Sequence, residues 1–216
     1  MRLIAHRGNI NGRNKKRENE IVYILEALNL GYDAEIDIRY SRSKNDYFLG
    51  HDIMQEKCPK ELLFNNKTWV HAKDIITFKN LLDQKVSNTF FHNNDDYTIT
   101  SKGIVWCYPG SSTVKNSVYL FPEKFPINMS EIIKHNLYLC TDYPLRYQTS
   151  ILIIVGMILG GICIYTSSKN KYVFTLMIIL CLLASRYLTL KIGGGSSQHP
   201  PFRLFALMIT GSFGTL

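Results

Sequence analysis

Two acidic residues in the N-terminal half have the spacing of a paired site. Glu35 and Asp37 lie two positions apart in the segment Asp-Ala-Glu-Ile-Asp-Ile, in which apolar and polar residues alternate. Side chains two positions apart in a β-strand point to the same face, so both carboxylates project to one side. Two carboxylates aimed at one point are costly unless a cation lies between them. The pair therefore predicts a divalent cation site, and oxygen ligands suit Mg²⁺ or Ca²⁺.

Further polar residues follow the other short apolar segments of this half of the chain. They are His6, Arg7, His51, His71 and Lys73. His71 and Lys73 are again two positions apart, so they share one face of a strand. A parallel barrel places its active site at the carboxyl ends of its strands. We therefore expect these side chains to gather with the acidic pair at one end of such a barrel.

The elements that must position these residues are short. Strands are predicted at residues 3–5, 33–38, 47–49, 69–71, 89–91, 104–106, 118–121 and 137–140. Helices are predicted at residues 19–30, ended by Gly31, and at residues 74–82, with Asp74 as the N-cap. Alternating strands and helices predict an α/β fold with a parallel barrel. Because a (β/α)₈ barrel typically takes about 250 residues, several helices must be missing or reduced to turns.

Five short motifs follow one another along residues 1–147. They are His6-Arg7-Gly8, Glu18-Asn19, Glu35-Ile36-Asp37, His51-Asp52 and Thr141-Asp142-Tyr143-Pro144. Their order and spacing resemble those of the glycerophosphodiester phosphodiesterase family, whose members are metal-dependent TIM barrels. Each motif alone is weak, whereas all of them in this order are specific. The resemblance covers the N-terminal domain and none of the residues beyond it.

The resemblance implies a role for each matching residue. His6 and His51 would be the general acid and base, Arg7 and Lys73 would contact the phosphate, and Glu35 and Asp37 would ligate the metal. The family's third ligand is a Glu two residues before the Lys, where this chain has His71. An imidazole there removes a negative charge and shifts the preference towards Mn²⁺ or Zn²⁺. A purely structural His71 is the alternative.

Four more residues are candidates for substrate contact: Glu18, Asn19, His92 and Trp106. Glu18 and Asn19 match the family's Glu-Asn pair, although a charge and a cap at a helix start explain them equally well. His92 fits either the site or a solvated loop. Trp106 would form an apolar wall for a headgroup, although a lone Trp is more often core. Asp142 is expected to orient the last loop rather than to react.

Charge is distributed unevenly along the chain. All 17 acidic residues lie between Glu18 and Asp142, so residues 143–216 have no carboxylate side chain. Residues 147–168 carry no charge, and as a helix they would span about 33 Å, enough for a hydrocarbon core of about 30 Å. Residues 172–190 predict a second span, interrupted only by Arg186, whose side chain can reach the interface. Buried core helices of a globular domain are the alternative.

These patterns predict three parts. A reduced (β/α)₈ TIM-type barrel occupies residues 1–147, a transmembrane helical hairpin residues 148–190, and a Gly/Ser/Pro linker with a short apolar tail residues 191–216. The N-terminus turns polar too early for a signal peptide. We therefore expect a multi-pass membrane protein with its N-terminal domain in the cytoplasm and the link at Lys169 and Lys171 outside.

The composition argues against several function classes. The net charge is +8, but the densest basic run, residues 13–17, lies in a short Asn-rich loop, which is not the footprint of a nucleic-acid binder. The five cysteines are widely spaced, which indicates neither a disulfide framework nor a zinc knuckle. The expected partners are the membrane and a phospholipid or glycerophosphodiester substrate, not nucleic acid.

The leading hypothesis is a membrane-anchored, metal-dependent phosphodiesterase that hydrolyses glycerophosphodiesters or lipid headgroup phosphodiesters. Phospholipase D-like activity on lysophospholipids is an alternative on the same barrel. A non-catalytic module that binds a phosphorylated headgroup or a glycan is the alternative from a different class. Retention of both histidines, the acidic pair and the phosphate-contacting cations favours catalysis.

Overall fold

The computed structural model describes residues 2–150 and Gly156. The chain divides into two compact units, Met1–Ile151 and Leu152–Leu216. Most of the predicted hairpin at residues 148–190, and all of the predicted tail at residues 191–216, lie outside the described residues. Among the residues that are described, no helix has both the length and the apolar character needed to cross a membrane.

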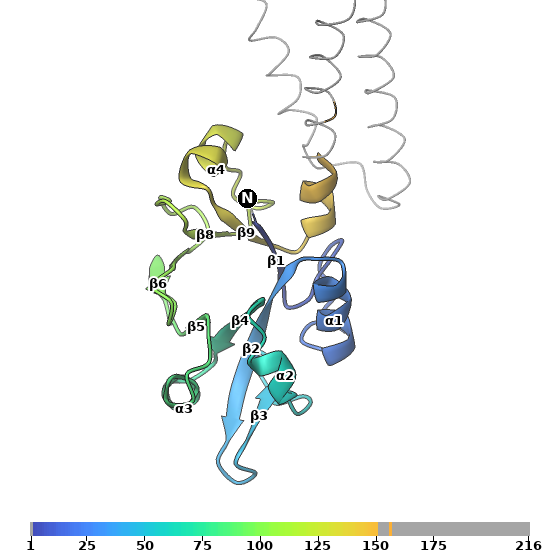
Figure 1. The fold of residues 1–216 in the computed structure, drawn as a ribbon, viewed down its shortest axis with the longest axis vertical. Helices are drawn as coiled ribbons and strands as arrows, with labels where there is room; N and C mark the ends of the chain where they lie inside the picture. Colours follow the sequence, from blue (N-terminus) through green and yellow to red (C-terminus); the bar gives the residue numbers. More distant parts are fainter. Residues whose placement is uncertain (1, 151–155, 157–216) are drawn as a thin grey trace, which may run out of the picture. The chain divides into compact units, whose positions relative to one another are not determined.

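The first unit is a mixed α/β structure around a nearly closed, barrel-like sheet (Figure 1). Its ring contains β1 (Arg2–His6), β2 (Asp33–Ser41), β4 (Thr68–Ala72), β5 (Thr89–Phe90), β6 (Tyr97–Ile99), β7 (Val105–Cys107), β8 (Val118–Leu120) and β9 (Tyr138–Thr141). The strand order is β5-β4-β2-β1-β9-β8-β7-β6, and every pair along it is parallel except β6 with β7. The sequence predicted a mainly parallel, barrel-like arrangement of short strands. The structure confirms this as a nearly closed ring of eight strands.

The ends of this path, β5 and β6, are joined by a seam of hydrogen bonds instead of a strand ladder. The Ser101 N–H donates to the Thr89 carbonyl at 2.7 Å, and the Thr89 N–H donates to Ser101 Oγ at 3.0 Å. The Thr98 hydroxyl donates to the Phe91 carbonyl at 2.9 Å. These contacts bring the ring of strands close to closure.

One predicted barrel strand has a different place. Residues 47–49 belong to β3 (Asp46–Leu49), which lies off the ring and pairs with β2 in the antiparallel sense. Only residues 42–45 separate the two strands, which suits a hairpin but is too short for a parallel crossover. The eighth position of the ring is taken instead by β6, which the sequence did not predict.

Few helices cover the sheet. They are α1 (Ile21–Asn29), α2 (Lys60–Leu63), α3 (Ile75–Asp83) and α4 (Met129–His135), with a further helical segment at residues 144–150. Asp74 caps α3 as predicted, because its side chain accepts a hydrogen bond from the Thr77 N–H at 2.7 Å. No helix separates β5 from β6 or β7 from β8. The predicted loss of helices therefore explains how about 150 residues complete such a ring.

The inside of the ring is filled by a cluster of large apolar side chains. Trp106 packs against Phe90, with ring centroids 4.3 Å apart, and against Trp69 at 5.8 Å. Ile4 and Cys140 complete the same cluster from β1 and β9. Full burial of each large side chain contributes about 1.5–3 kcal/mol. This packed layer supports the polar residues at the carboxyl ends of the strands.

Candidate active site

A cavity of about 410 Å³ opens at the carboxyl ends of the parallel strands. Its lining includes residues at or just beyond the ends of six of these strands: His6, Lys73, His92, Tyr108, Phe121 and Asp142. His51 and Arg13 also line it from loops. This is the end of a parallel barrel at which active sites are found.

The predicted metal ligands come together at the β2 and β4 side of this cavity. Asp37 and His71 are paired positions of the β2–β4 ladder, and Glu35 lies two residues before Asp37 on the same face. One ligand atom from each of the three residues lies within 4.8 Å of the others. His71 Nδ1 is 3.3 Å from Asp37 Oδ1 and 3.6 Å from Glu35 Oε1. The imidazole thus points at both carboxylates.

The donor set fits a divalent cation. Asp37 is fully buried, and within the described part of the chain its Oδ1 accepts no well-aligned hydrogen bond. Its nearest cationic neighbours, His71 Nδ1 and Lys73 Nζ, each lie 3.3 Å away, and a bound cation would give this buried oxygen a direct partner. Burial alone would raise the pKa of Asp37, but His71, Arg7 and Lys73 hold it well below its usual range. Two carboxylates and an imidazole suit a divalent metal, including the borderline ions Mn²⁺ and Zn²⁺.

The His71 imidazole stacks on two other rings. Its ring stacks on Phe90 with centroids 4.8 Å apart and on His92 at 5.2 Å. Burial lowers the pKa of His71, but contacts with Asp37 and Glu35 outweigh this and raise it. Burial and the charge of His71 lower the pKa of His92 to about 4, so His92 is neutral at neutral pH. Stacking therefore fixes the plane of the imidazole that faces the carboxylates.

Arg7 connects the site to its surroundings. Its backbone N–H donates to Glu35 Oε2 at 3.1 Å, and its Nε lies 2.8 Å from Asp37 Oδ2. Its Nη1 donates to Glu18 Oε2 at 3.1 Å. Arg7 has a φ of 53°, a left-handed conformation that is uncommon for residues other than glycine. Arg7 lines the cavity, and it also contacts both predicted metal ligands of β2, Glu35 and Asp37.

Glu18 and Asn19 are buried outside the cavity lining. Glu18 Oε1 accepts hydrogen bonds from Arg13 Nε at 2.9 Å and Asn9 Nδ2 at 3.3 Å. Asn19 Nδ2 donates to Asp37 Oδ2 at 2.9 Å, and its Oδ1 accepts from the Asp37 N–H at 2.9 Å. The alternative that Asn19 caps a helix is wrong, because α1 begins at Ile21, after Glu20. Asn19 instead holds Asp37, a predicted metal ligand, in place.

His6 forms a buried pair with Asp142. His6 Nδ1 is 2.8 Å from Asp142 Oδ1, which also accepts a hydrogen bond from Asn9 Nδ2 at 2.9 Å. This leaves His6 Nε2 facing Glu35 Oε2 at 3.9 Å. Burial raises the pKa of Asp142, but the bond with His6 outweighs it, so the net shift is downwards. The sequence prediction gave Asp142 only a role in its loop; the structure shows that it orients His6.

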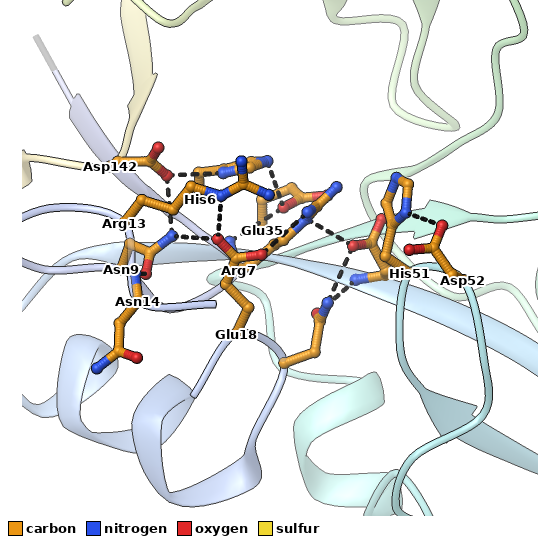
Figure 2. A network of polar contacts seen from close by, with 12 residues as sticks. His6, Arg7, Asn9, Arg13, Asn14, Glu18, Glu35, His51, Asp52 and Asp142 are labelled. Carbon is orange, nitrogen blue, oxygen red and sulfur yellow. Dashed lines mark hydrogen bonds and ion pairs between the residues drawn. The ribbon is translucent and has the colours of Figure 1, made fainter. Parts of the chain in front are cut away.

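His51 lies in a more exposed part of the cavity. Its side chain is 40% exposed, against 10% for His6. His51 Nδ1 is 2.7 Å from Asp52 Oδ1, and its carbonyl accepts hydrogen bonds from the Arg39 guanidinium, the shorter at 2.6 Å. Figure 2 shows His6 and His51 on either side of Glu35 and Arg7. The site therefore has one buried and one exposed His–Asp pair.

No protein-family model, curated protein or solved structure matches this chain.

The remaining lining residues include several that sequence reasoning did not select. They are Arg13, Asn93, Tyr108, Phe121 and Lys124. His92 and Trp106, both predicted as candidate contacts, line the cavity as well. Trp106 is only 2% exposed and belongs also to the packed layer inside the ring. Asn93, Tyr108 and Phe121 lie within three residues of a strand end, which is the signal that could have found them, whereas Arg13 and Lys124 lie farther from the strands.

Proposed function

We propose that this chain is a metal-dependent phosphodiesterase. The observation that carries the proposal is the cluster of Glu35, Asp37 and His71, whose ligand atoms lie within 4.8 Å of one another. The same cavity is lined by His6 and His51. A reduced (β/α)₈ TIM-type barrel of the glycerophosphodiester phosphodiesterase kind is the finer fold that we propose. The parallel ring of strands, with these residues at its carboxyl ends, supports it.

The metal ligands would act on the charge of the substrate. A divalent cation held by Glu35, Asp37 and His71 would neutralise the phosphodiester and stabilise the charge that develops in the transition state. Mg²⁺ or Ca²⁺ suits the carboxylates, and His71 extends the choice to Mn²⁺ or Zn²⁺. Lys73 Nζ, 3.3 Å from Asp37 Oδ1, places a further positive charge where the phosphate would bind.

The two histidines would move the protons. Asp142 holds Nδ1 of His6, which leaves Nε2 to exchange a proton inside the cavity. His51, from the opposite side, would likewise exchange a proton, so that each histidine serves one ester oxygen of the phosphodiester. One imidazole would accept the proton of the attacking hydroxyl, and the other would protonate the leaving alcohol. Arg7 and Lys73 would hold the phosphate between them.

The substrate would be a glycerophosphodiester or the phosphodiester of a lipid headgroup. The apolar, carboxylate-free composition of residues 143–216 supports a membrane setting, with the N-terminal domain in the cytoplasm. Nucleic acid is not among the partners that we propose.

Hydrolysis assays on the full chain test this function. Glycerophosphocholine and a lysophospholipid should be hydrolysed with Mg²⁺, Ca²⁺, Mn²⁺ or Zn²⁺ present and not with a chelator. His6→Ala and His51→Ala should each lower turnover by roughly 10²–10⁴-fold. His135→Ala is the matched control, because His135 lies in α4 outside the cavity lining. Absence of metal-dependent turnover of any diester, or equal turnover in both site variants and the wild type, would refute the proposal.

A further inference from the structure

A turn after β8 places a lysine across the cavity from the metal ligands. Lys124 lines the cavity. In the strand order, β8 is four places from β4, which carries His71. In a nearly closed ring of eight strands, four places correspond to opposite sides. The Lys124 side chain therefore adds positive charge on the side away from the cation site.

The turn that carries Lys124 is firmly anchored. The Lys124 N–H donates to the Phe121 carbonyl at 3.0 Å. Glu123 accepts hydrogen bonds from the Thr141 hydroxyl at 2.8 Å and from the Asp142 N–H at 3.0 Å. The Tyr119 hydroxyl donates to the Phe125 carbonyl at 3.0 Å. These contacts tie the turn to β8 and to the end of β9.

The aromatic ring beneath Lys124 is held in an unusual backbone conformation. Phe121 has a φ of 53°, which is rare for a bulky residue. Its ring packs edge-on against His6 with centroids 4.7 Å apart. Lys124 Nζ lies 3.9 Å from the centre of the same ring. Backbone strain of this kind persists where the surroundings enforce it, often at ligand sites.

The charge of Lys124 has no carboxylate partner in the described part of the chain. No carboxylate oxygen there lies within 4.0 Å of Lys124 Nζ. The carboxylates of Glu123, next to it in sequence, and of Asp142 already accept the hydrogen bonds described above. Lys73, in contrast, is paired with Asp37.

A second cation lies on the same side. Arg13 lines the cavity, and its Nε donates to Glu18. A guanidinium has five N–H donors, so four of them are left to bind an anion. Glu18 Oε1, which accepts from Arg13, also accepts from Asn9 Nδ2, and the same amide donates to Asp142, the partner of His6. The charge of Lys124 also acts on Asp142. Arg13 and Lys124 thus lie on the His6 side of the cavity, near the place where one alcohol group of a bound phosphodiester would extend.

We infer that Lys124 and Arg13 form a second anion site, so that the preferred substrate carries a second negatively charged group beyond the scissile phosphate. This inference rests on the proposed phosphodiesterase function. The substrate class is a phosphodiester whose alcohol carries a phosphomonoester or a carboxylate. A quaternary ammonium headgroup is disfavoured, because Lys124 already occupies the face of Phe121 that could receive it. Like charges brought together there would repel each other.

Three soluble diesters test the inference with the full chain and its metal. They are glycerophosphocholine, glycerophosphoglycerol and glycerophosphoglycerol carrying a terminal phosphate. The wild type should show a kcat/KM for the phosphorylated diester at least about tenfold above that for glycerophosphocholine, as expected for one charged hydrogen bond. Lys124→Gln should reduce this ratio by about tenfold. Lys102→Gln is the control, because Lys102 is exposed and outside the cavity lining, and it should keep the ratio.

The outcomes separate the two proposals. If the wild type hydrolyses none of the three diesters, the proposed function fails, and the inference fails with it. If it hydrolyses them with equal kcat/KM, or if the ratio survives Lys124→Gln, the inference alone is overturned. If Lys124→Gln lowers kcat/KM equally for all three, Lys124 contacts the scissile phosphate, and the second anion site is also refuted. Circular dichroism of each variant checks that it is folded.

Discussion

Asn19 should be one of the main polar supports of the N-terminal unit. Its side chain makes two hydrogen bonds to Asp37, one to the buried carboxylate and one to the backbone N–H, both at 2.9 Å. Asn19 also has a φ of 64°, which glycine adopts freely and alanine does not. Replacing it by glycine therefore removes the two hydrogen bonds and leaves the backbone conformation unstrained. Replacing it by alanine removes the same bonds and adds backbone strain.

The expected losses follow from these contacts. A hydrogen bond to a charged group contributes about 1.5–3 kcal/mol and one between neutral groups about 0.5–1.5 kcal/mol. Asn19→Gly should therefore lower the free energy of unfolding by about 3 kcal/mol. Asn19→Ala should lower it by about 1 kcal/mol more, because of the cost of a left-handed conformation.

Urea titrations followed by tryptophan fluorescence measure the free energy of unfolding of the full chain and of each variant. The chain has two tryptophans, Trp69 and Trp106, and both are buried in the ring, so the signal reports on this unit. Asn116→Gly is the matched control, because Asn116 also has a positive φ but is exposed. It should change the free energy of unfolding by no more than about 0.5 kcal/mol. A change that small for Asn19→Gly would refute the reasoning.

Three further predictions concern the site. Asp142→Asn should lower turnover by roughly 10²–10⁴-fold in a diester assay without unfolding the protein, because it loses the group that orients His6. The pKa of Asp142 is lowered in the fold, so its contribution to stability is present above the ordinary value of 3.8 and is lost as pH falls below it. Between about pH 4 and pH 2, the stability of Asp142→Asn should therefore fall less than that of the wild type in urea titrations. Saturating Mn²⁺, at about 100 times its Kd, should raise the unfolding temperature by about 5–10 °C in a thermal shift assay. This shift should be absent in Glu35→Gln. It should be present in the control Glu131→Gln, because Glu131 lies in α4.

The strands could be predicted from the sequence because alternation and short apolar runs are local properties. Residues 33–38 are the clearest example of such a local pattern. Their alternation predicts Glu35 and Asp37 on one face of the strand, and the structure has them on one face of β2. Strand partners are not local. The sequence predicted residues 47–49 as a strand, but only the short link from β2 reveals that this strand turns back as a hairpin. The short β6 carries too little periodicity to be predicted.

The same distinction holds for the candidate site. The predicted metal ligands follow from a spacing of two within strands, and the β2–β4 register brings His71 opposite Asp37. The residues that hold the side chains of the site in place follow from no spacing rule. Asn19 reaches Asp37 across 18 positions, and Asp142 reaches His6 across 136. Such contacts depend on how the ring closes, and so they were missed or given a different role.

The seam between β5 and β6 has a mechanical consequence. Strands β2 and β4, which carry the predicted metal ligands, are each paired on both sides, whereas the seam is held mainly by Thr89, Thr98 and Ser101. His92 and Asn93, on the loop that crosses the seam, line the cavity. Transient separation of β5 and β6 at this seam would widen the cavity, whereas β2 and β4 would keep their register and so keep the predicted metal ligands together. Under the proposed function, the ring would vary its internal width on one side for bulkier headgroups and stay rigid on the other.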